Sequence, residues 1–367
     1  MRQGGALPDH KIQDLINNGF LSGVTNVDSV RPSSLDLTIT GEVFRVRGAF
    51  LPAIGESVLS ALKRVGSTKL SGEKILLEKG CCYVLPLNEV VSKLPEGVYA
   101  YCNPKSSSGR VDMHVRLLVD SCSRYDAVEQ AYSGNLWLLV VPKTFPVIVF
   151  PGLSLNQIRF FTADTRFDEW DLRMNFNGLI FDCDGGQAKY EDQRHSDRDG
   201  SILLSLGLGF QNPGFEAIEG GDPIDLSLRS HYDPKYYFRP ITVFNRSLTL
   251  NTGTFYILST KEHVVVPPHL TCEMVPMDER SGDLRSHYAG FIDPGWGVTQ
   301  QVGTFGRTLT LEVRSFDNGI IIQDGQPIAK VRYEKVFGVP DAHYDEKSPT
   351  YGRQNGPKLG KQFKEWE

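Results

Sequence analysis

The chain has 367 residues, which is long enough for two domains that each bury a core of their own. Hydrophobic residues make up 40% and charged residues 23% of the chain, as in an ordinary globular protein. The net charge of −5 excludes a general attraction to nucleic-acid polymers or anionic membranes, but local Arg and Lys clusters leave a small phosphorylated ligand open. Without a long apolar run or the apolar core of a secretory signal, we expect a cytoplasmic protein with no membrane partner.

Helical patterns are few. The segment after Pro8 places its apolar residues on one helical face and ends at Asn18-Gly19, and residues 58–65 form the other clear helical pattern. Most of the chain consists of short β-branched and aromatic runs separated by Gly, Pro, Asn and Asp. This composition predicts an all-β sandwich or barrel with a short N-terminal helix.

An internal repeat organises the predicted strands. LEKGCCYVLPLNEVVSKLPEGVYA at 77–100 and LNTGTFYILSTKEHVVVPPHLTCE at 250–273 both place a Gly before an aromatic-apolar strand, which a charged turn follows. Each copy continues with a basic-Ser segment, KSSSGR at 105–110 and RSGDLR at 280–285. The same order at nearly the same spacing predicts a duplication.

The repeat implies two tandem β-domains, at residues 1–181 and 201–337. The stretch 182–200 is polar, charged and Gly-containing, which is typical of an interdomain linker. Residues 338–367 are rich in Gly, Pro and charge, and we expect them to form a C-terminal lid or tail that is mobile without ligand.

The KSSSGR segment has the composition of a phosphate site. It offers three hydroxyls, two cations and a permissive glycine in six residues, and a triphosphate needs such groups converging on one turn. An isolated segment of this kind is more often a solvated polar turn, but its place in the repeat favours phosphate binding. The residues concerned are Lys105, Ser106, Ser107, Ser108 and Arg110.

Glu312 lies in the apolar run LTLEV, where a carboxylate is costly to desolvate unless it is paired or functional. The alternation of polar and apolar residues over 308–312 is also typical of a Glu that faces solvent. Counting back thirteen residues from Gly325 gives Glu312, whereas the same count from Gly152 gives Leu139. That only one copy keeps the acid favours a functional carboxylate.

Several segments together resemble the dCTP deaminases, a family that shares its fold with the trimeric dUTPases. These segments are DHKIQDLINNGFL at 9–21, RPSSLDLTITGEVFRV at 31–46, KSSSGR at 105–110, AGFIDPGWG at 289–297, LTLEV at 309–313 and YGRQNGP at 351–357. The resemblance implies two tandem dUTPase-like β-barrel or jelly-roll domains. It also implies a homo-oligomer, either a trimer or a dimer.

The resemblance further implies hydrolytic deamination of dCTP to dUTP and ammonia. Glu312 is then the general base, and Ser107 and Arg110 complete the catalytic group. The substrate-binding residues it implies are Lys105, Ser106, Ser108, Arg280, Ser281, Arg285, Asp293, Tyr351, Arg353 and Gln354. The sequence has neither the H-x-E nor the P-C-x-x-C segment of zinc deaminases, so we expect no protein-bound catalytic metal. Mg²⁺ is expected to travel with the nucleotide triphosphate.

Three alternative functions stay open: a dUTPase that releases dUMP and pyrophosphate, a chain with both activities, and a non-catalytic nucleotide-binding protein. In a dUTPase, Asp293 would be the base. Otherwise Asp293 either caps its turn or meets the deoxyribose. The Ser-Arg partner of Glu312 is either KSSSGR or RSGDLR, within one chain or between chains; in RSGDLR the second serine is replaced by Gly282.

Overall fold

The structure is a computed structural model, and it describes residues 4–194, 197–277, 280, 284–286, 290–298, 306–315, 319–347, 351 and 354–367, with only the backbone of 284–286. Two units emerge, which we describe separately: unit 1 comprises residues 1–163, 219–233 and 360–367, and unit 2 comprises residues 164–218 and 234–359. The stretch expected to be a linker, 182–200, thus lies within unit 2, and the expected tail is divided between the units. The difference arises because contacts between distant segments, which chain order does not reveal, define the units.

The helices and strands of unit 1 are α1 (Asp9–Asn17), β1 (Leu21–Ser22), η1 (Val27–Ser29), β2 (Leu35–Thr38), β3 (Glu42–Val46), α2 (Val58–Val65), β4 (Ser67–Ser71), β5 (Ile75–Leu77), β6 (Cys82–Val91), β7 (Tyr99–Pro104), α3 (Ser106–Gly109), β8 (Met113–Val119), β9 (Ala127–Val128), β10 (Gly134–Pro142), β11 (Val147–Val149), β12 (Ser154–Phe161) and β16 (Ile224–Asp225). Both predicted helices, α1 and α2, are confirmed. The Ser57 hydroxyl caps α2 by accepting the Ser60 N–H at 3.1 Å.

The helices and strands of unit 2 are α4 (Glu169–Asn175), β13 (Ile180–Phe181), α5 (Tyr190–Gln193), β14 (Ser201–Ser205), β15 (Phe215–Ala217), η2 (Pro234–Tyr236), β17 (Phe238–Pro240), β18 (Ser247–Leu250), β19 (Phe255–Ser259), β20 (His263–Val264), β21 (Leu270–Val275), β22 (Leu284–Ser286), β23 (Phe291–Ile292), β24 (Thr310–Ser315), β25 (Ile320–Gln323), β26 (Pro327–Lys335) and α6 (Tyr344–Lys347). The protein is therefore mainly β with few helices, as predicted. None of the helices in the described residues is both long enough and apolar enough to span a membrane.

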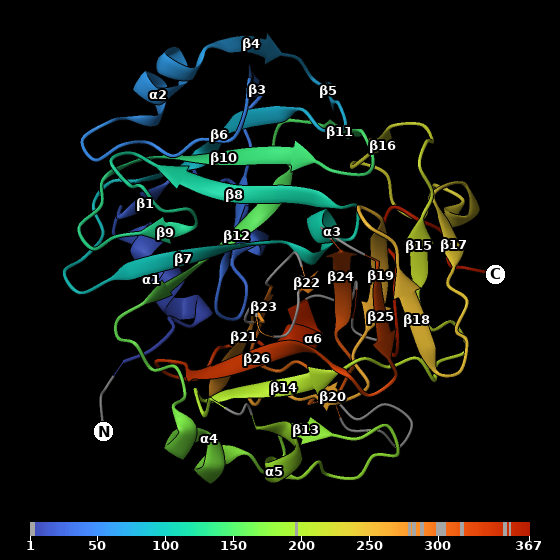
Figure 1. The fold of residues 1–367 in the computed structure, drawn as a ribbon. Coiled ribbons are helices and arrows are strands. Elements are labelled where there is room, and N and C mark those ends of the chain that lie inside the picture. Colours follow the sequence, from blue (N-terminus) through green and yellow to red (C-terminus); the bar gives the residue numbers. More distant parts are fainter. Residues whose placement is uncertain are drawn as a thin grey trace. The chain divides into compact units, whose positions relative to one another are not determined.

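Three sheets of unit 1 have counterparts in unit 2. In unit 1 the largest sheet has the order β4-β3-β6-β10-β8, and its counterpart in unit 2 has the order β17-β15-β19-β24-β22 (Figure 1). A second sheet, β2-β12-β7-β9, matches β14-β26-β21-β23, and the pair β5–β11 matches β18–β25. This shared topology confirms the predicted duplication.

Equivalent buried carboxylates show that the duplication extends to single hydrogen bonds. Glu89 in unit 1 accepts the backbone N–H of Thr38 at 2.8 Å and also its hydroxyl at 2.7 Å. Glu262 in unit 2 accepts the N–H of Ser205 at 2.8 Å together with the Ser205 hydroxyl. These carboxylates are 1% and 6% exposed, so Glu89 ties down β2 and Glu262 ties down β14 at equivalent buried points.

The duplicated units differ at one connection. In unit 1 the connection from β3 to β4 forms α2, whose Val58 and Leu62 pack with Leu139 of β10 in one apolar cluster. In unit 2 the corresponding connection from β15 to β17 includes residues 219–233, which belong to unit 1, where β16 pairs in parallel with β11. Among the described residues, this connection therefore provides no counterpart of α2 within unit 2.

We predict that Glu89→Gln destabilises the protein by about 1–3 kcal/mol, because an amide has one acceptor oxygen for two buried donors. Chemical denaturation at several pH values measures this. Burial raises the pKa of the Glu89 carboxyl above its ordinary 4.5. The contribution of Glu89 to the stability of the wild type is therefore fully present below pH 4.5 and is lost as the pH rises through the raised pKa. The stability of the Gln variant should lack this pH-dependent loss.

The control is Glu96→Gln at an exposed site, which should change stability by less than about 0.5 kcal/mol. An equal effect of the two substitutions would contradict the structural role of Glu89.

Candidate functional site

Glu312 lies in β24 opposite Ile257 of β19, and only 4% of it is exposed. Its neighbours Leu311 and Val313 belong to the core of unit 2. Because successive strand residues point to opposite faces, the Glu312 carboxylate is on the face of the sheet turned away from that core. The interpretation of Glu312 as a solvent-facing residue is therefore wrong.

The ladder register confirms the position that the sequence predicts to be equivalent in unit 1. Leu139 of β10 lies opposite Val84 of β6, as Glu312 lies opposite Ile257. Leu139 and Val84 are fully buried in the cluster that contains α2. An acid at position 139 would be buried among apolar side chains. The described residues of unit 2 contain no helix equivalent to α2 that would cover Glu312 in the same way.

Thr310 shares the face of Glu312 in β24. Thr310 is two residues before it, and the core residues Leu309 and Leu311 flank Thr310 on the opposite face. Thr310 is 6% exposed, and its hydroxyl is buried with no hydrogen-bond partner among the residues that the structure describes. A buried hydroxyl of this kind is costly unless a ligand or a water satisfies it. Thr308 and Thr310 belong to the alternating pattern visible in the sequence, but that pattern indicates no role for Thr310.

The C-terminal segment docks on Thr308, two residues before Thr310. Gln354 donates from its side-chain amide to the Thr308 carbonyl at 2.8 Å, and the Gly356 N–H donates to the Thr308 hydroxyl at 2.8 Å. Gln354 is 3% exposed, and Tyr351 belongs to the core of unit 2. Arg353, also predicted in this segment, lies outside the described residues. The predicted lid thus contacts the chain four residues before Glu312.

In unit 1 the KSSSGR segment forms the short helix α3. Lys105 precedes it and pairs with Asp36 at 2.5 Å. Ser106 is exposed and Ser107 half-buried, while the buried Ser108 hydroxyl donates to a backbone carbonyl at 2.9 Å. Two of the three hydroxyls therefore remain at the surface, and the role of Ser108 in substrate binding stays a prediction.

Arg110 ends this segment and is 3% exposed. Its backbone N–H donates to the Ser106 carbonyl at 2.9 Å. The last residues of the chain pass beside it, because a Cβ placed on Gly360 would lie 3.5 Å from the Arg110 Cβ. The contact between residues 110 and 360 has no signal in the sequence, since 250 residues separate them.

The turn predicted to meet a sugar contains Asp293, which is 6% exposed. Two backbone hydrogen bonds with Val266 hold the turn in place. The Gly295 N–H donates to the Val266 carbonyl at 2.9 Å, and the Val266 N–H donates to the Trp296 carbonyl at 2.8 Å. Gly295 has φ +91° and its Cβ position lies 2.6 Å from a side chain, so no other residue fits there. Trp296 is buried in the core with the Arg307 guanidinium 5.6 Å from its ring, and it therefore packs the turn.

The second Ser-Arg segment is described only in part. Arg280 is exposed and pairs with Asp197. Ser281 lies outside the described residues, and for Arg285 only the backbone is described, opposite Arg314 of β24. The roles of these three residues stay predictions.

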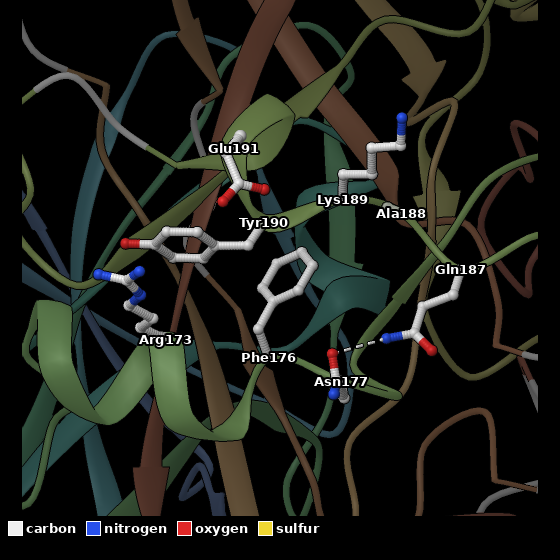
Figure 2. Close-up of a pocket in the computed structure, with 8 residues that line it drawn as sticks. All are labelled: Arg173, Phe176, Asn177, Gln187, Ala188, Lys189, Tyr190 and Glu191. Carbon is white, nitrogen blue, oxygen red and sulfur yellow. Dashed lines mark hydrogen bonds between the residues drawn. The ribbon is translucent and has the colours of Figure 1, made fainter.

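A surface pocket of about 380 Å³ lies elsewhere in unit 2, between α4 and α5. Figure 2 shows the rings of Phe176 and Tyr190 near its centre, with Arg173 and Glu191 beside them. The two rings meet edge to face at 5.7 Å, and the Tyr190 hydroxyl donates to Glu169. None of the predicted site residues lines this pocket, and its opposite charges favour no ligand class, so we do not assign it the reaction.

Comparisons with known proteins agree with the resemblance. Residues 3–164 match a family model described as the 2'-deoxycytidine 5'-triphosphate deaminase (DCD) N-terminal domain, and residues 186–363 match the C-terminal domain of that family. Among solved structures, the crystal structure of 2'-deoxycytidine 5'-triphosphate deaminase from Agrobacterium tumefaciens is 33% identical, with a TM-score of 0.84 over 92% of this chain and 97% of that chain. No protein in the curated comparison matches.

We predict that Thr308→Val loosens the C-terminal segment, because the Gly356 N–H loses its acceptor. Amide hydrogen exchange of residues 354–359 should accelerate about threefold to tenfold, the equivalent of one net hydrogen bond. Thr249→Val at an exposed position of β18 is the matched control. If both variants exchange at the wild-type rate, the Thr308 contact does not hold the segment.

Proposed function

The chain belongs to the dCTP deaminase family and deaminates dCTP, and we propose that Glu312 is the general base of this reaction. The observation that carries the proposal is a carboxylate 4% exposed on the non-core face of β24. A carboxylate in such a position is costly to retain unless it is paired or functional. Its absence from the equivalent position in unit 1 supports a role that only one copy supplies.

In the proposed mechanism, water attacks C4 of the cytosine while the Glu312 carboxylate takes a proton from it. The proton passes to N3, which gives a tetrahedral intermediate with both a hydroxyl and the amino group on C4. Glu312 then moves the hydroxyl proton to the amino group, the C4–N bond breaks, and ammonia leaves. The balance is dCTP plus water to dUTP plus ammonia, and the water is the only co-reactant.

We propose that the Thr310 hydroxyl positions the attacking water. Residues i and i+2 on one strand face lie about 6.6 Å apart, so one water can be about 3 Å from both Thr310 and Glu312. The buried Thr310 hydroxyl has no hydrogen-bond partner within the described ranges of the chain, which supports this, because a water bound there would satisfy it. Such a hydrogen bond would point a lone pair of the water toward the cytosine ring.

The remaining site residues keep the roles that the family resemblance implies. Ser107 and Arg110 are proposed to stabilise charge at the tetrahedral stage. Tyr351, Arg353 and Gln354 are proposed to close over the nucleotide and exclude water, and Asp293 to meet the deoxyribose. The residues proposed for the phosphates are Lys105, Ser106, Ser108, Arg280, Ser281 and Arg285.

Other expectations also stand as proposals. We propose that each unit closes its sheets into a dUTPase-like barrel or jelly roll, and that the chain is a cytoplasmic homo-oligomer, a trimer or a dimer. The reaction is proposed to need no protein-bound metal, with Mg²⁺ bound through the triphosphate. The absence of the zinc-deaminase segments from the sequence supports the first part of that statement.

We predict that Glu312→Gln lowers kcat for dCTP deamination by about 10² to 10⁴, because the amide cannot accept the proton of the water. Ammonia release and dUTP formation measure the loss, and Glu96→Gln at an exposed site is the control. Pyrophosphate release from dUTP tests the alternative dUTPase activity in the same samples. Deamination at the wild-type rate would remove Glu312 from the mechanism.

We predict opposite effects of Thr310→Val on activity and stability. The variant keeps the shape of the side chain but loses the water contact, so kcat falls about threefold to tenfold with little change in KM. Removing an unsatisfied buried hydroxyl leaves the melting temperature equal or higher. Thr310→Ser, which keeps the hydroxyl, should restore kcat. A Val variant with wild-type kcat, or one that only loses stability, would contradict the role of Thr310.

A further inference from the structure

Helix α4 of unit 2 has apolar side chains on two opposite faces. Leu172 and Phe176 lie about one helical turn apart and pack in the core of unit 2. Trp170 and Met174 are also one turn apart, but they lie on the outer face, where they are 72% and 79% exposed. Because a surface helix usually has polar residues on its outer face, this pair of apolar side chains is typical of a surface that a partner covers.

Two adjoining hollows lie beside Trp170. The pocket of about 380 Å³ between α4 and α5 shares Arg173, Tyr190 and Glu191 with a second hollow of about 280 Å³, which Trp170 also lines. We call the two together the α4–α5 groove. Figure 2 shows the Arg173 guanidinium and the Glu191 carboxylate beside the Tyr190 ring. The groove therefore combines an aromatic lining with charges of both signs, and Trp170 stands at its edge.

The charged groups of the groove have no partners of their own. The side chains of Arg173 and Glu191 make no hydrogen bond and no ion pair with any other residue in the part of the chain that the structure describes. The Phe176 and Tyr190 rings meet edge to face at 5.7 Å. An indole ring would suit all of these groups, because it packs on aromatic edges, attracts a guanidinium to its face and donates its N–H to a carboxylate.

We propose that the α4–α5 groove is a contact between two copies of this chain, in which Trp170 of each copy enters the groove of the other. A two-fold contact joins the same surface of both copies, so that surface must be complementary to itself. The α4–α5 surface meets this condition, because it carries both an exposed Trp and a groove suited to one. The inference rests on the proposed function only in naming one contact of the homo-oligomer, and it uses no step of the reaction.

The charges favour a second copy over a partner of a single charge sign. In a two-fold contact Arg173 of each copy can pair with Glu191 of the other, so both groups are satisfied. A purely acidic or purely basic partner would pair with one of these groups and leave the other facing a like charge. The opposite charges that favour no small ligand therefore favour self-association.

The first test measures association of the full chain by sedimentation equilibrium over a range of concentrations. Trp170→Ala should raise the dissociation constant about 30-fold or more, as expected for the loss of a central aromatic anchor. Since Trp170 is exposed in the single chain, the substitution should leave the melting temperature of the dilute protein unchanged. The matched control is Phe244→Ala, which removes another exposed ring of unit 2 and should associate as the wild type does.

The second test exchanges the charges of the groove. Arg173→Glu places two acids opposite each other in the contact and should weaken association about tenfold. Adding Glu191→Arg to the same chain restores opposite charges, and the double variant should recover most of the wild-type affinity. Both residues are exposed, so neither substitution should change the fold.

The results decide between this contact and others. A wild type that stays monomeric, or an oligomer that Trp170→Ala leaves unchanged, overturns the inference. Weaker association of Arg173→Glu without recovery in the double variant contradicts the two-fold arrangement. Glu312→Gln should lose deamination but associate as the wild type does, so a failure of the proposed base and a failure of this contact are distinguishable.

Discussion

The position of the Glu312 carboxylate depends on the ladder between β19 and β24. Once Leu311 and Val313 are packed in the core of unit 2, strand alternation places Glu312 and Thr310 on the opposite face. A shift of the strand by one residue would turn the carboxylate into the apolar core and move Leu311 to the opposite face. The packing of the apolar core therefore fixes the direction in which the polar side chains of β24 point.

The duplication explains why one copy carries the acid. In unit 1 the connection between β3 and β4 forms α2, and its apolar face covers Leu139 at the position equivalent to Glu312. In unit 2 the equivalent connection contributes residues 219–233 to unit 1 instead. Both copies have the buried carboxylate, Glu89 or Glu262, that ties down β2 or β14.

The C-terminal residues belong to both units. Gln354 and Gly356 bond to Thr308 in unit 2, and residues 360–364 pair with 230–232 in unit 1. Three apolar side chains of this segment, Tyr351, Leu359 and Phe363, are also buried.

The sequence alone determined the mainly β class, the helices α1 and α2 and the duplication, and it singled out Glu312 as a candidate base. These results follow from local periodicity and from comparing one copy with the other. The burial of Glu312, the lack of a partner for the Thr310 hydroxyl among the described residues and the pairing of the C-terminal residues with residues 230–232 were decided only by the tertiary structure. Each depends on contacts between residues far apart in the chain, as with Lys361 and Ser230. Local patterns carry no record of such contacts, since the pairing partner is selected by the packing of the whole unit.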